Sequence, residues 1–253
     1  MYADLDGKVV IVTGGGAGIG EAIARAFADD GCKVVVAGRR KEPIERVAGA
    51  SSGLAVPTDV SKEADVAALI GACEAAFGRL DILINNAAVV GPTVSIADED
   101  AATWDETFAI NVRGVALCIK HAAALLRKSR GAIVNISSIA GIQANPRRGA
   151  YAASKHAVLG LTQAAAFELG PDGVRVNAVC PGGVDTEMFR ELLPLRKGSE
   201  GMNIDQLVER AGSGNALGRL AKPEEVAQTT LFLASAAAGA ITGQHLVVDA
   251  GKR

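Results

Sequence analysis

Short apolar runs alternate with amphipathic segments along this chain, and that alternation constrains its fold more than any other feature. Seven runs are predicted as strands: Lys8–Thr13, Lys33–Ala37, Leu54–Pro57, Asp81–Asn85, Ala132–Ser137, Val174–Val179 and His245–Asp249. Helices are predicted at Gly18–Asp30, Lys41–Ala50, Lys62–Phe77 with Ser61 as its N-cap, Thr103–Lys128, Tyr151–Leu169 and Pro223–Ala234. Such alternation predicts an α/β fold, a doubly wound parallel sheet with helices on both faces.

Composition narrows the class of protein. The 253 residues contain no linker rich in Pro, Gly or Ser, so we expect a single domain over residues 1–253. A net charge of −2 argues against a nucleic-acid or membrane-surface protein. No signal peptide and no membrane span is visible, and the four scattered cysteines predict buried free thiols, with no metal site. The cytoplasm is the expected location.

A glycine-rich turn follows the first predicted strand and opens the first helix. Its sequence is Thr-Gly-Gly-Gly-Ala-Gly-Ile-Gly, from Thr13 to Gly20. Gly14 permits the tight turn, Gly18 lets the backbone approach a pyrophosphate, and Gly20 lets the helix pack closely on the strand. The helix N-terminus offers N–H groups and partial positive charge to phosphates. This context predicts a dinucleotide site.

A second cluster predicts proton transfer. Tyr151 and Lys155 are i and i+4 on one helix and share a face. A nearby ammonium stabilises a phenolate, so we expect Lys155 to lower the pKa of Tyr151. Ser138 ends a predicted strand, at the sheet edge where ligands bind, and is expected to bind the substrate oxygen. Ser137 is the competing serine; His121, His156 and His245 lack the partners of a triad or a metal site.

These motifs together resemble the short-chain dehydrogenase/reductase family. The resemblance runs along the whole chain and includes Asp59-Val60, Asn85-Asn86-Ala87, Asn111, Ile136-Ser137-Ser138 and Pro181-Gly182 through Thr186. Ala88 and Ala250 stand where the family has glycine. The resemblance implies a Rossmann-type sheet in the order 3-2-1-4-5-6-7 and a catalytic set of Asn111, Ser138, Tyr151 and Lys155. It also implies that Lys155 binds the nicotinamide ribose and that Asn111 holds a water linking Lys155 to solvent.

The end of the second predicted strand bears on the choice of cofactor. Gly38 stands where an aspartate would exclude a 2′-phosphate, and Arg39 follows it, with Arg40 as a weaker candidate. We therefore expect NADP(H) to be preferred over NAD(H). The full set of expected cofactor contacts is Gly14, Gly16, Gly18, Ile19, Gly20, Arg39, Arg40, Asp59, Val60, Asn86, Ala87, Tyr151, Lys155, Pro181, Gly182, Val184 and Thr186.

The expected activity is interconversion of a ketone and a secondary alcohol by hydride transfer. Ser138, Gln143, Tyr151 and Met188 are the expected substrate contacts, and the long irregular stretch from about 185 to 215 is expected to close over them as a lid. An NAD-linked sugar or polyol dehydrogenase, a 3-oxoacyl-thioester reductase and a dinucleotide-sensing binding protein remain alternatives. Small residues on the two long helices, together with the resemblance, predict a homotetramer.

Overall fold

The computed structural model describes residues 2–50, 53–143, 145–194 and 198–252. Within these residues, seven parallel strands form one sheet in the order β3-β2-β1-β4-β5-β6-β7. The strands are β1 (Val9–Thr13), β2 (Lys33–Gly38), β3 (Leu54–Pro57), β4 (Ile82–Asn85), β5 (Ala132–Ile136), β6 (Arg175–Pro181) and β7 (His245–Val248). The predicted fold class and strand order are confirmed.

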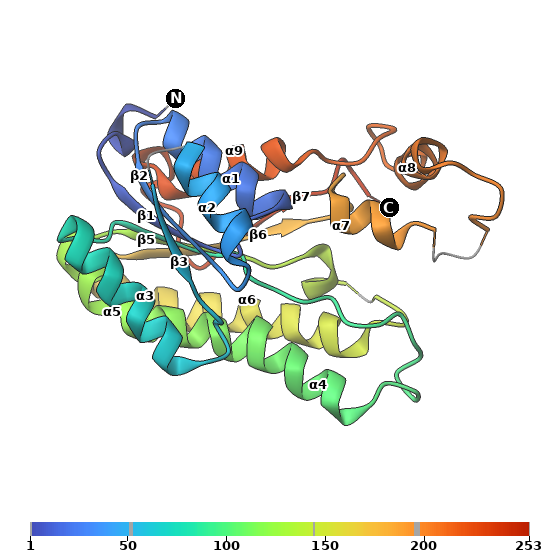
Figure 1. Cartoon of the computed structure of the whole chain (residues 1–253), viewed down its shortest axis with the longest axis horizontal. Coiled ribbons are helices and arrows are strands. Elements are labelled where there is room, and N and C mark those ends of the chain that lie inside the picture. The colour runs from blue at the N-terminus through green and yellow to red at the C-terminus, as the bar shows by residue number, and fades with distance from the viewer. Residues whose placement is uncertain (1, 51–52, 144, 195–197, 253) are drawn as a thin grey trace.

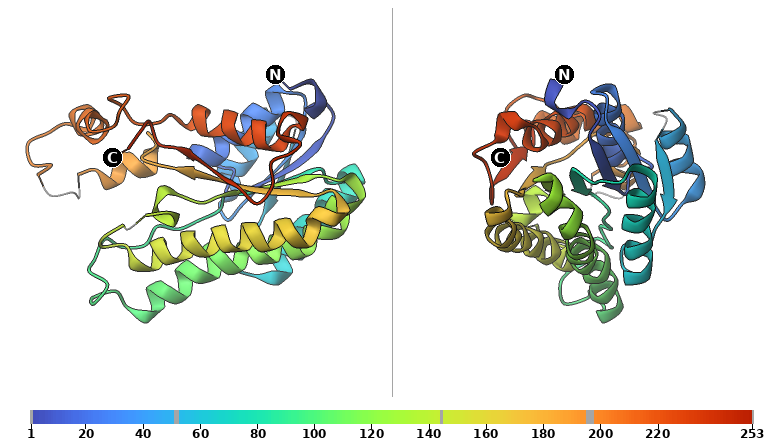
Figure 2. Two further views of the ribbon diagram at one scale, coloured as in Figure 1. Left: turned by 180° about the vertical axis from the view of Figure 1, so that it is seen from behind. Right: turned by 90° about the vertical axis from the view of Figure 1, so that its left-hand side faces the viewer.

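Helices cover both faces of this sheet (Figures 1 and 2). On one face lie α1 (Gly18–Asp29), α2 (Lys41–Ala50) and α9 (Pro223–Ala234); on the other lie α3 (Glu63–Phe77), α5 (Gly114–Ser129) and α6 (Gly149–Leu169). Val10 and Val12 of β1 belong to the first core, and Val9 and Ile11 to the second. A strand buried on both faces must be apolar throughout, which explains the continuous apolar runs.

The predicted long helix consists of three parts in one continuous helix. α4 (Ala101–Phe108) continues through a π-helical turn, η2 (Ala109–Arg113), into α5. By length and composition this helix, Ala101–Ser129, could cross a membrane. Its Cys118, Ala122 and Leu126 are buried against the sheet, however, which is how the core helix of a folded domain meets the same criterion. The sequence did not predict the π turn, which places Asn111 in the buried core.

The stretch predicted to be irregular contains two helices. α7 (Glu187–Leu192) is capped by the Thr186 side chain, and α8 (Ile204–Ser213) has a capping box of Asn203 and Gln206. The prediction of an irregular stretch was therefore wrong, although the Asn-x-x-Gln spacing is a helix-start signal. Arg190 of α7 pairs with Asp185 at 2.7 Å and with Asp205 of α8 at 3.4 Å, which ties the two helices together. Residues 195–197 of this stretch lie outside the described residues.

A few smaller differences between the predicted and the observed structure have local causes. Ser61 does not cap α3; its hydroxyl donates to Asp59 Oδ1 at 2.7 Å, and Lys62 occupies the N-cap position. Ala250 has a φ of 56°, in the left-handed region that favours glycine, and it is one of the positions where the family pattern has glycine. Short 3₁₀ turns lie at Ala3–Leu5, Ile139–Gly141, Gly170–Asp172 and Ala236–Ala238.

Candidate active site and dinucleotide cleft

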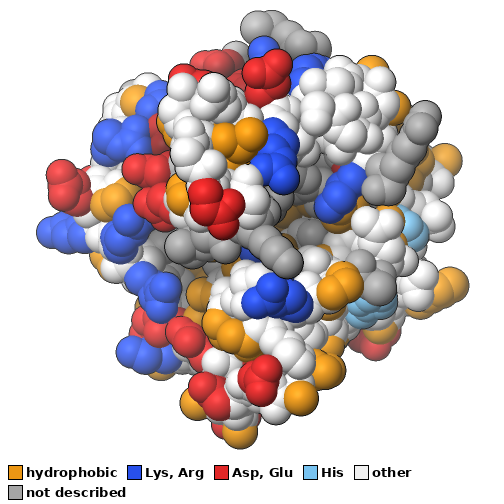
Figure 3. Space-filling model, turned by 90° about the vertical axis from the view of Figure 1, so that its right-hand side faces the viewer, with side chains coloured by type: hydrophobic (Ala, Val, Ile, Leu, Met, Phe, Trp, Pro, Cys, Tyr) orange, Lys and Arg blue, Asp and Glu red, His pale blue; other side chains and the backbone are white. Residues whose placement is uncertain are grey.

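The residues predicted to bind cofactor or substrate gather at one edge of the sheet. They follow the carboxyl ends of the strands: Thr13–Gly20 after β1, Arg39 after β2, Asp59 after β3, Asn86 after β4 and Ser138 after β5. Acidic and basic side chains are interspersed on this end of the molecule (Figure 3). Ligands of open parallel sheets bind at such an edge.

Hydrogen bonds join the glycine-rich turn to the residues that follow β4. Thr13 Oγ1 accepts hydrogen bonds from the backbone N–H groups of Asn86 at 3.0 Å and Ala87 at 3.1 Å. Asn86 Nδ2 donates in return to the carbonyls of Thr13 at 3.0 Å and Gly14 at 3.1 Å. A Cβ on Gly20 would collide with the Gly14 carbonyl oxygen and with Asn86 Nδ2. Gly20 is thus required because the first turn of α1 lies against the backbone that follows β1 and against the Asn86 side chain.

The turn leaves the N-terminus of α1 available to an anion. Its N-cap residue is Ala17, and no described side chain caps the first turn. Uncapped N–H groups and the helix dipole make such a terminus a phosphate site. Thr186 lies against it, since a Cβ on Gly18 would sit 3.5 Å from Thr186 Cγ2. Gly18 and Thr186, two of the predicted cofactor contacts, are therefore neighbours in space.

Ser138, Tyr151 and Lys155 meet between β5 and α6. Lys155 Nζ donates to the carbonyl of Ile136 at 2.9 Å and lies 5.7 Å from the centroid of the Tyr151 ring. Ser138 lies close enough to Tyr151 to lower the pKa of its phenol, and its hydroxyl donates to the Pro181 carbonyl at 3.5 Å. The Ser137 hydroxyl instead donates to the Lys155 carbonyl at 2.9 Å. The contact of Ser138 with Tyr151 favours Ser138 over Ser137 as the serine that faces a substrate.

Burial dominates the ionisation of this pair. It raises the pKa of the Tyr151 phenol above its ordinary value, while the hydrogen bond with Ser138 and the charge of Arg148 act in the opposite direction. Burial also lowers the pKa of Lys155 to about 8. The expected lowering of the Tyr151 pKa is therefore wrong for this structure, because loss of solvation around the phenol outweighs the effects of Ser138 and of the Arg148 charge.

Asn111 is buried in the π turn with its side chain fully engaged. Its Oδ1 accepts from the Val89 N–H at 2.8 Å, and its Nδ2 donates to the Val89 carbonyl at 2.8 Å and to Ser154 Oγ at 3.0 Å. Ser154 Oγ in turn donates to the Tyr151 carbonyl at 2.7 Å. Asn111 thus joins the segment after β4 to the helix that carries Tyr151. The water relay remains a prediction.

Sequence reasoning missed two residues that hold α6. Ser154 lies inside the Tyr-Ala-Ala-Ser-Lys motif, so its place beside Asn111 could have been suspected. Glu99 could not, because it lies far from α6 in the sequence; its Oε2 accepts from the Ala150 N–H at 3.0 Å. Arg148, the N-cap residue of α6, makes no side-chain cap. Glu99 therefore supplies a cap from a distant loop.

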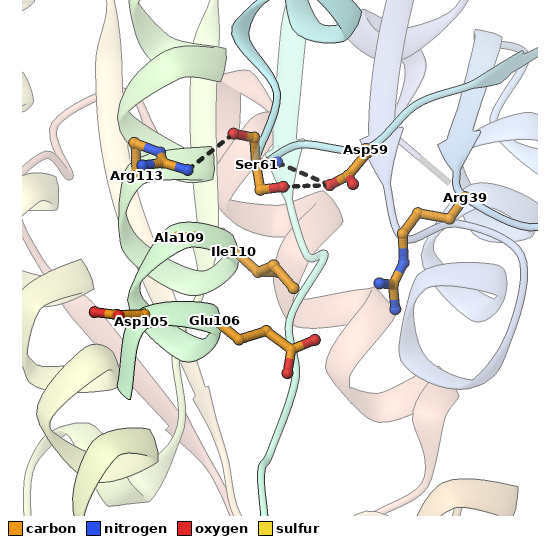
Figure 4. A pocket seen from close by; sticks show the side chains of 8 residues that line it. All are labelled: Arg39, Asp59, Ser61, Asp105, Glu106, Ala109, Ile110 and Arg113. Carbon is orange, nitrogen blue, oxygen red and sulfur yellow. Dashed lines mark hydrogen bonds between the residues drawn. The ribbon is translucent and has the colours of Figure 1, made fainter. Parts of the chain in front are cut away.

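A cavity of about 450 Å³ opens beside the ends of β2 and β3 (Figure 4). It is lined by Arg39, Asp59, Ser61, Asp105, Glu106, Ala109, Ile110 and Arg113. Asp59 Oδ1 accepts from the backbone N–H of Ser61 at 3.1 Å as well as from its hydroxyl. Two of the predicted cofactor contacts, Arg39 and Asp59, therefore share this cavity, while Val60 is buried beside it and Arg40 is exposed.

Of the predicted substrate contacts, Ser138 is buried and Tyr151 half-buried, whereas the other two are on the surface. Gln143 is exposed, and Met188 on α7 is 54% exposed. Among the histidines, His121 Nε2 lies 3.1 Å from Glu63 and His156 Nδ1 lies 2.9 Å from the Ala152 carbonyl, away from Tyr151. In the described residues, no group of three or more His, Cys, Asp or Glu side chains could hold a metal ion, and the four cysteines are free and buried.

Comparison with known proteins agrees with this geometry. Residues 14–253 match the family model described as enoyl-(acyl carrier protein) reductase. The chain is 39% identical over 253 residues to 2,5-dichloro-2,5-cyclohexadiene-1,4-diol dehydrogenase of Sphingobium indicum, with 98% of each chain covered. It is 41% identical over 258 residues to 2-(S)-hydroxypropyl-CoM dehydrogenase 3 of Xanthobacter autotrophicus, covering 99% of this chain and 98% of that one.

A solved structure extends the similarity to the whole fold. Aldohexose dehydrogenase of Thermoplasma acidophilum superposes with a TM-score of 0.92 at 36% identity, covering 99% of this chain and 96% of that chain. The glycine-rich turn, the Tyr151 and Lys155 pair on α6 and these full-length matches lead to one conclusion. The chain belongs to the short-chain dehydrogenase/reductase family of oxidoreductases.

Proposed function

We propose that this protein interconverts a secondary alcohol and a ketone with NADP(H), using Ser138, Tyr151 and Lys155 as catalytic residues and Asn111 to position them. The observation that carries the proposal is the meeting of β5 and α6. It sets a serine, a tyrosine and a lysine together at the sheet edge that also holds the glycine-rich turn. A site of this kind can move a proton at an oxygen while a cofactor moves the hydride.

The residues present fit a nicotinamide dinucleotide. The uncapped N-terminus of α1 would hold its diphosphate, the cavity beside β2 and β3 would hold its adenosine, and Thr186 with Lys155 would hold its nicotinamide half. When bound, this cofactor supplies the hydride acceptor for an alcohol and the hydride donor for a ketone.

Tyr151 exchanges the proton of the substrate hydroxyl. In the oxidation direction the phenolate oxygen takes this proton as the hydride leaves carbon, and in the reduction direction the phenol returns it to the carbonyl oxygen. Ser138 donates a hydrogen bond to that oxygen and stabilises the charge that develops on it. The ammonium of Lys155, held by the Ile136 carbonyl, stabilises the phenolate. Because burial alone raises the pKa of Tyr151, the phenolate depends on such cations.

The proposed preference for NADP(H) rests on the end of β2. Arg39 projects into the cavity and forms no ion pair there with a described residue, so its guanidinium is available to a phosphate (Figure 4). Gly38 carries no carboxylate to repel one. Gly16 offers no second basic side chain in the glycine-rich turn, and a Cβ there would lie 3.0 Å from Pro43 Cβ.

The substrate is proposed to be a small alcohol or ketone bound under α7 and α8. Relatives named as dehydrogenases of a cyclic diol and of a hydroxypropyl compound support an alcohol substrate. The lid of the single domain is proposed to be residues 185–215, with Met188 and Gln143 as contacts. The ion pairs of Arg190 hold α7 and α8 as one unit that could close.

Assembly and location belong to the same proposal. A homotetramer in which α4–α5 and α6 pack against a second copy is supported by Phe167 of α6, whose side chain is 84% exposed. A monomeric mass by light scattering at micromolar concentration would contradict it. The buried free cysteines are typical of a cytoplasmic protein.

The activity is tested by following cofactor absorbance across a panel of secondary alcohols, polyols, sugars, cyclic ketones and 3-oxoacyl thioesters. Turnover that Tyr151→Phe lowers at least about a hundredfold, with cofactor binding retained, supports the proposal. Preference for sugars or polyols with NAD, or for 3-oxoacyl thioesters, would select one of those alternatives. Cofactor binding without turnover of any class would indicate a dinucleotide-sensing protein.

Cofactor preference is tested by dissociation constants rather than turnover. NADPH should bind more tightly than NADH, and Arg39→Ala should remove most of the difference by weakening NADPH alone. Equal affinities in the wild type, or a preference that Arg39→Ala leaves untouched, would remove Arg39 from this role.

A further inference from the structure

Both walls of the cavity beside β2 and β3 carry charged side chains of both signs: Arg39 and Asp59 on the strand side, and Asp105, Glu106 and Arg113 on the helix side. Arg39 enters it from the end of β2, and Glu106 enters it from α4 (Figure 4). In that view the Glu106 side chain points across the cavity toward the side on which Arg39 lies. The neighbouring Asp105 points the other way from the same helix turn. One carboxylate of this pair therefore faces Arg39 and the other does not.

Two of the other charged groups around this cavity, Asp59 and Arg113, are held in place by hydrogen bonds. Asp59 is hydrogen-bonded to Ser61 and lies 4.0 Å from Lys62. Arg113 donates to the Ser61 carbonyl at 3.1 Å. Within the described part of the chain, neither Arg39 nor Glu106 forms a salt bridge. Arg39 and Glu106 are therefore charged side chains that point into the cavity from its two walls without a salt bridge. Asp59 and Arg113 keep their charges beside them, and Asp105 points the other way (Figure 4).

We propose that Glu106 is a specificity-determining residue that limits the preference for the phosphorylated cofactor. This inference rests on the proposed dinucleotide function and concerns the cavity into which Arg39 projects. A 2′-phosphate brings close to two negative charges to that cavity, and NADH lacks them. Arg39 attracts such a group, whereas the Glu106 carboxylate repels it. The ribose 2′-hydroxyl of NADH is uncharged, so this repulsion does not act on NADH.

The strength of the repulsion between Glu106 and a 2′-phosphate depends on how far solvent screens it. Arg39 and Glu106 are both exposed, so water and salt screen their interaction with a ligand at the rim. An adenosine that fills part of the cavity displaces some of that water, which strengthens the repulsion. We expect removal of the charge to change the affinity for NADPH about threefold to tenfold and the affinity for NADH less than about twofold.

The test measures dissociation constants of NADPH and NADH by fluorescence, without turnover, for the wild type, Glu106→Gln and Asp105→Asn. Glu106→Gln should tighten NADPH by the stated factor and leave NADH nearly unchanged, and the gain should shrink between about 0.05 M and about 0.5 M salt. Asp105→Asn removes the same charge one residue away and should change neither constant by more than about twofold.

Three results would overturn the proposal: unchanged NADPH affinity in Glu106→Gln, equal gains for both cofactors, or the same selective gain in Asp105→Asn. Glutamine keeps the shape and helix propensity of glutamate at this exposed position, and retained NADH binding reports an intact site. Failure of the cofactor preference itself appears separately, as equal wild-type affinities or no effect of Arg39→Ala. The Glu106 effect is read from the difference between variant and wild type, so the two outcomes are distinguishable.

Discussion

Replacing Gly20 with alanine should damage stability and cofactor binding together. A methyl group at this position would collide with the Gly14 carbonyl oxygen and would come within 2.5 Å of Asn86 Nδ2. Both atoms take part in the hydrogen bonds between the glycine-rich turn and the residues after β4. The Asn86 side chain must move, and with it the two hydrogen bonds that it donates to Thr13 and Gly14.

The magnitude follows from these contacts. Each lost hydrogen bond costs about 1 kcal/mol, and forcing extra volume into a packed site costs about 1–3 kcal/mol. Alanine recovers about 1 kcal/mol because it favours the helical backbone of α1 more than glycine does. The free energy of unfolding should therefore fall by about 2–4 kcal/mol. Cofactor affinity should fall at least about tenfold, since the displaced turn borders the proposed phosphate site.

The assay is urea denaturation and cofactor titration, with Gly71→Ala as the matched control. Gly71 lies within α3, and a Cβ there meets nothing within 4 Å. The same substitution should leave the control unchanged or stabilise it by up to about 1 kcal/mol. A loss below about 1 kcal/mol in Gly20→Ala, together with unchanged cofactor affinity, would refute the reasoning.

Three further predictions concern single residues. Burial lowers the pKa of Lys155 from 10.5 to about 8, so between about pH 8 and pH 10.5 the unfolded chain binds more protons than the folded chain. The free energy of unfolding, relative to that of Lys155→Met, should therefore rise with pH across this range. Urea denaturation of both proteins below about pH 8 and above pH 10.5 checks it. Glu99→Ala should lower kcat and the free energy of unfolding, the latter by about 1 kcal/mol, while Glu99→Gln, which keeps an acceptor for the Ala150 N–H, should restore most of kcat; equal kcat in both variants contradicts this. Ala250 has a left-handed φ that costs an L-residue about 1 kcal/mol, so Ala250→Gly should raise the melting temperature. An unchanged or lower melting temperature in calorimetry would contradict this prediction.

Periodic patterns and turn residues predicted most of the fold. Apolar runs such as Val9–Val12 are buried on both faces, so their positions follow from composition over a few residues. The boundaries of β3, α2 and α9 also match the prediction. The helices after Thr186 were missed because the capping residues Thr186 and Asn203 were not weighed as helix starts.

The candidate site divides in the same way. The order of Gly14, Gly18 and Gly20 and the i, i+4 spacing of Tyr151 and Lys155 are local, and they sufficed to predict a dinucleotide and a proton-transfer site. The pKa of Tyr151 was predicted in the wrong direction, because solvation of a phenol depends on everything packed around it. No spacing within α6 could reveal that burial.

What the sequence by itself determined was the alternation of strands and helices, the glycine-rich turn, and the chemistry of the side chains at the ends of the strands. The tertiary structure alone decided which distant groups meet. It set Glu99 at the N-terminus of α6, the Asn111 side chain between Val89 and Ser154, and Glu106 in the cavity with Arg39. Local patterns follow from backbone geometry over a few residues, whereas these contacts join segments that only the packing of helices on the sheet brings together.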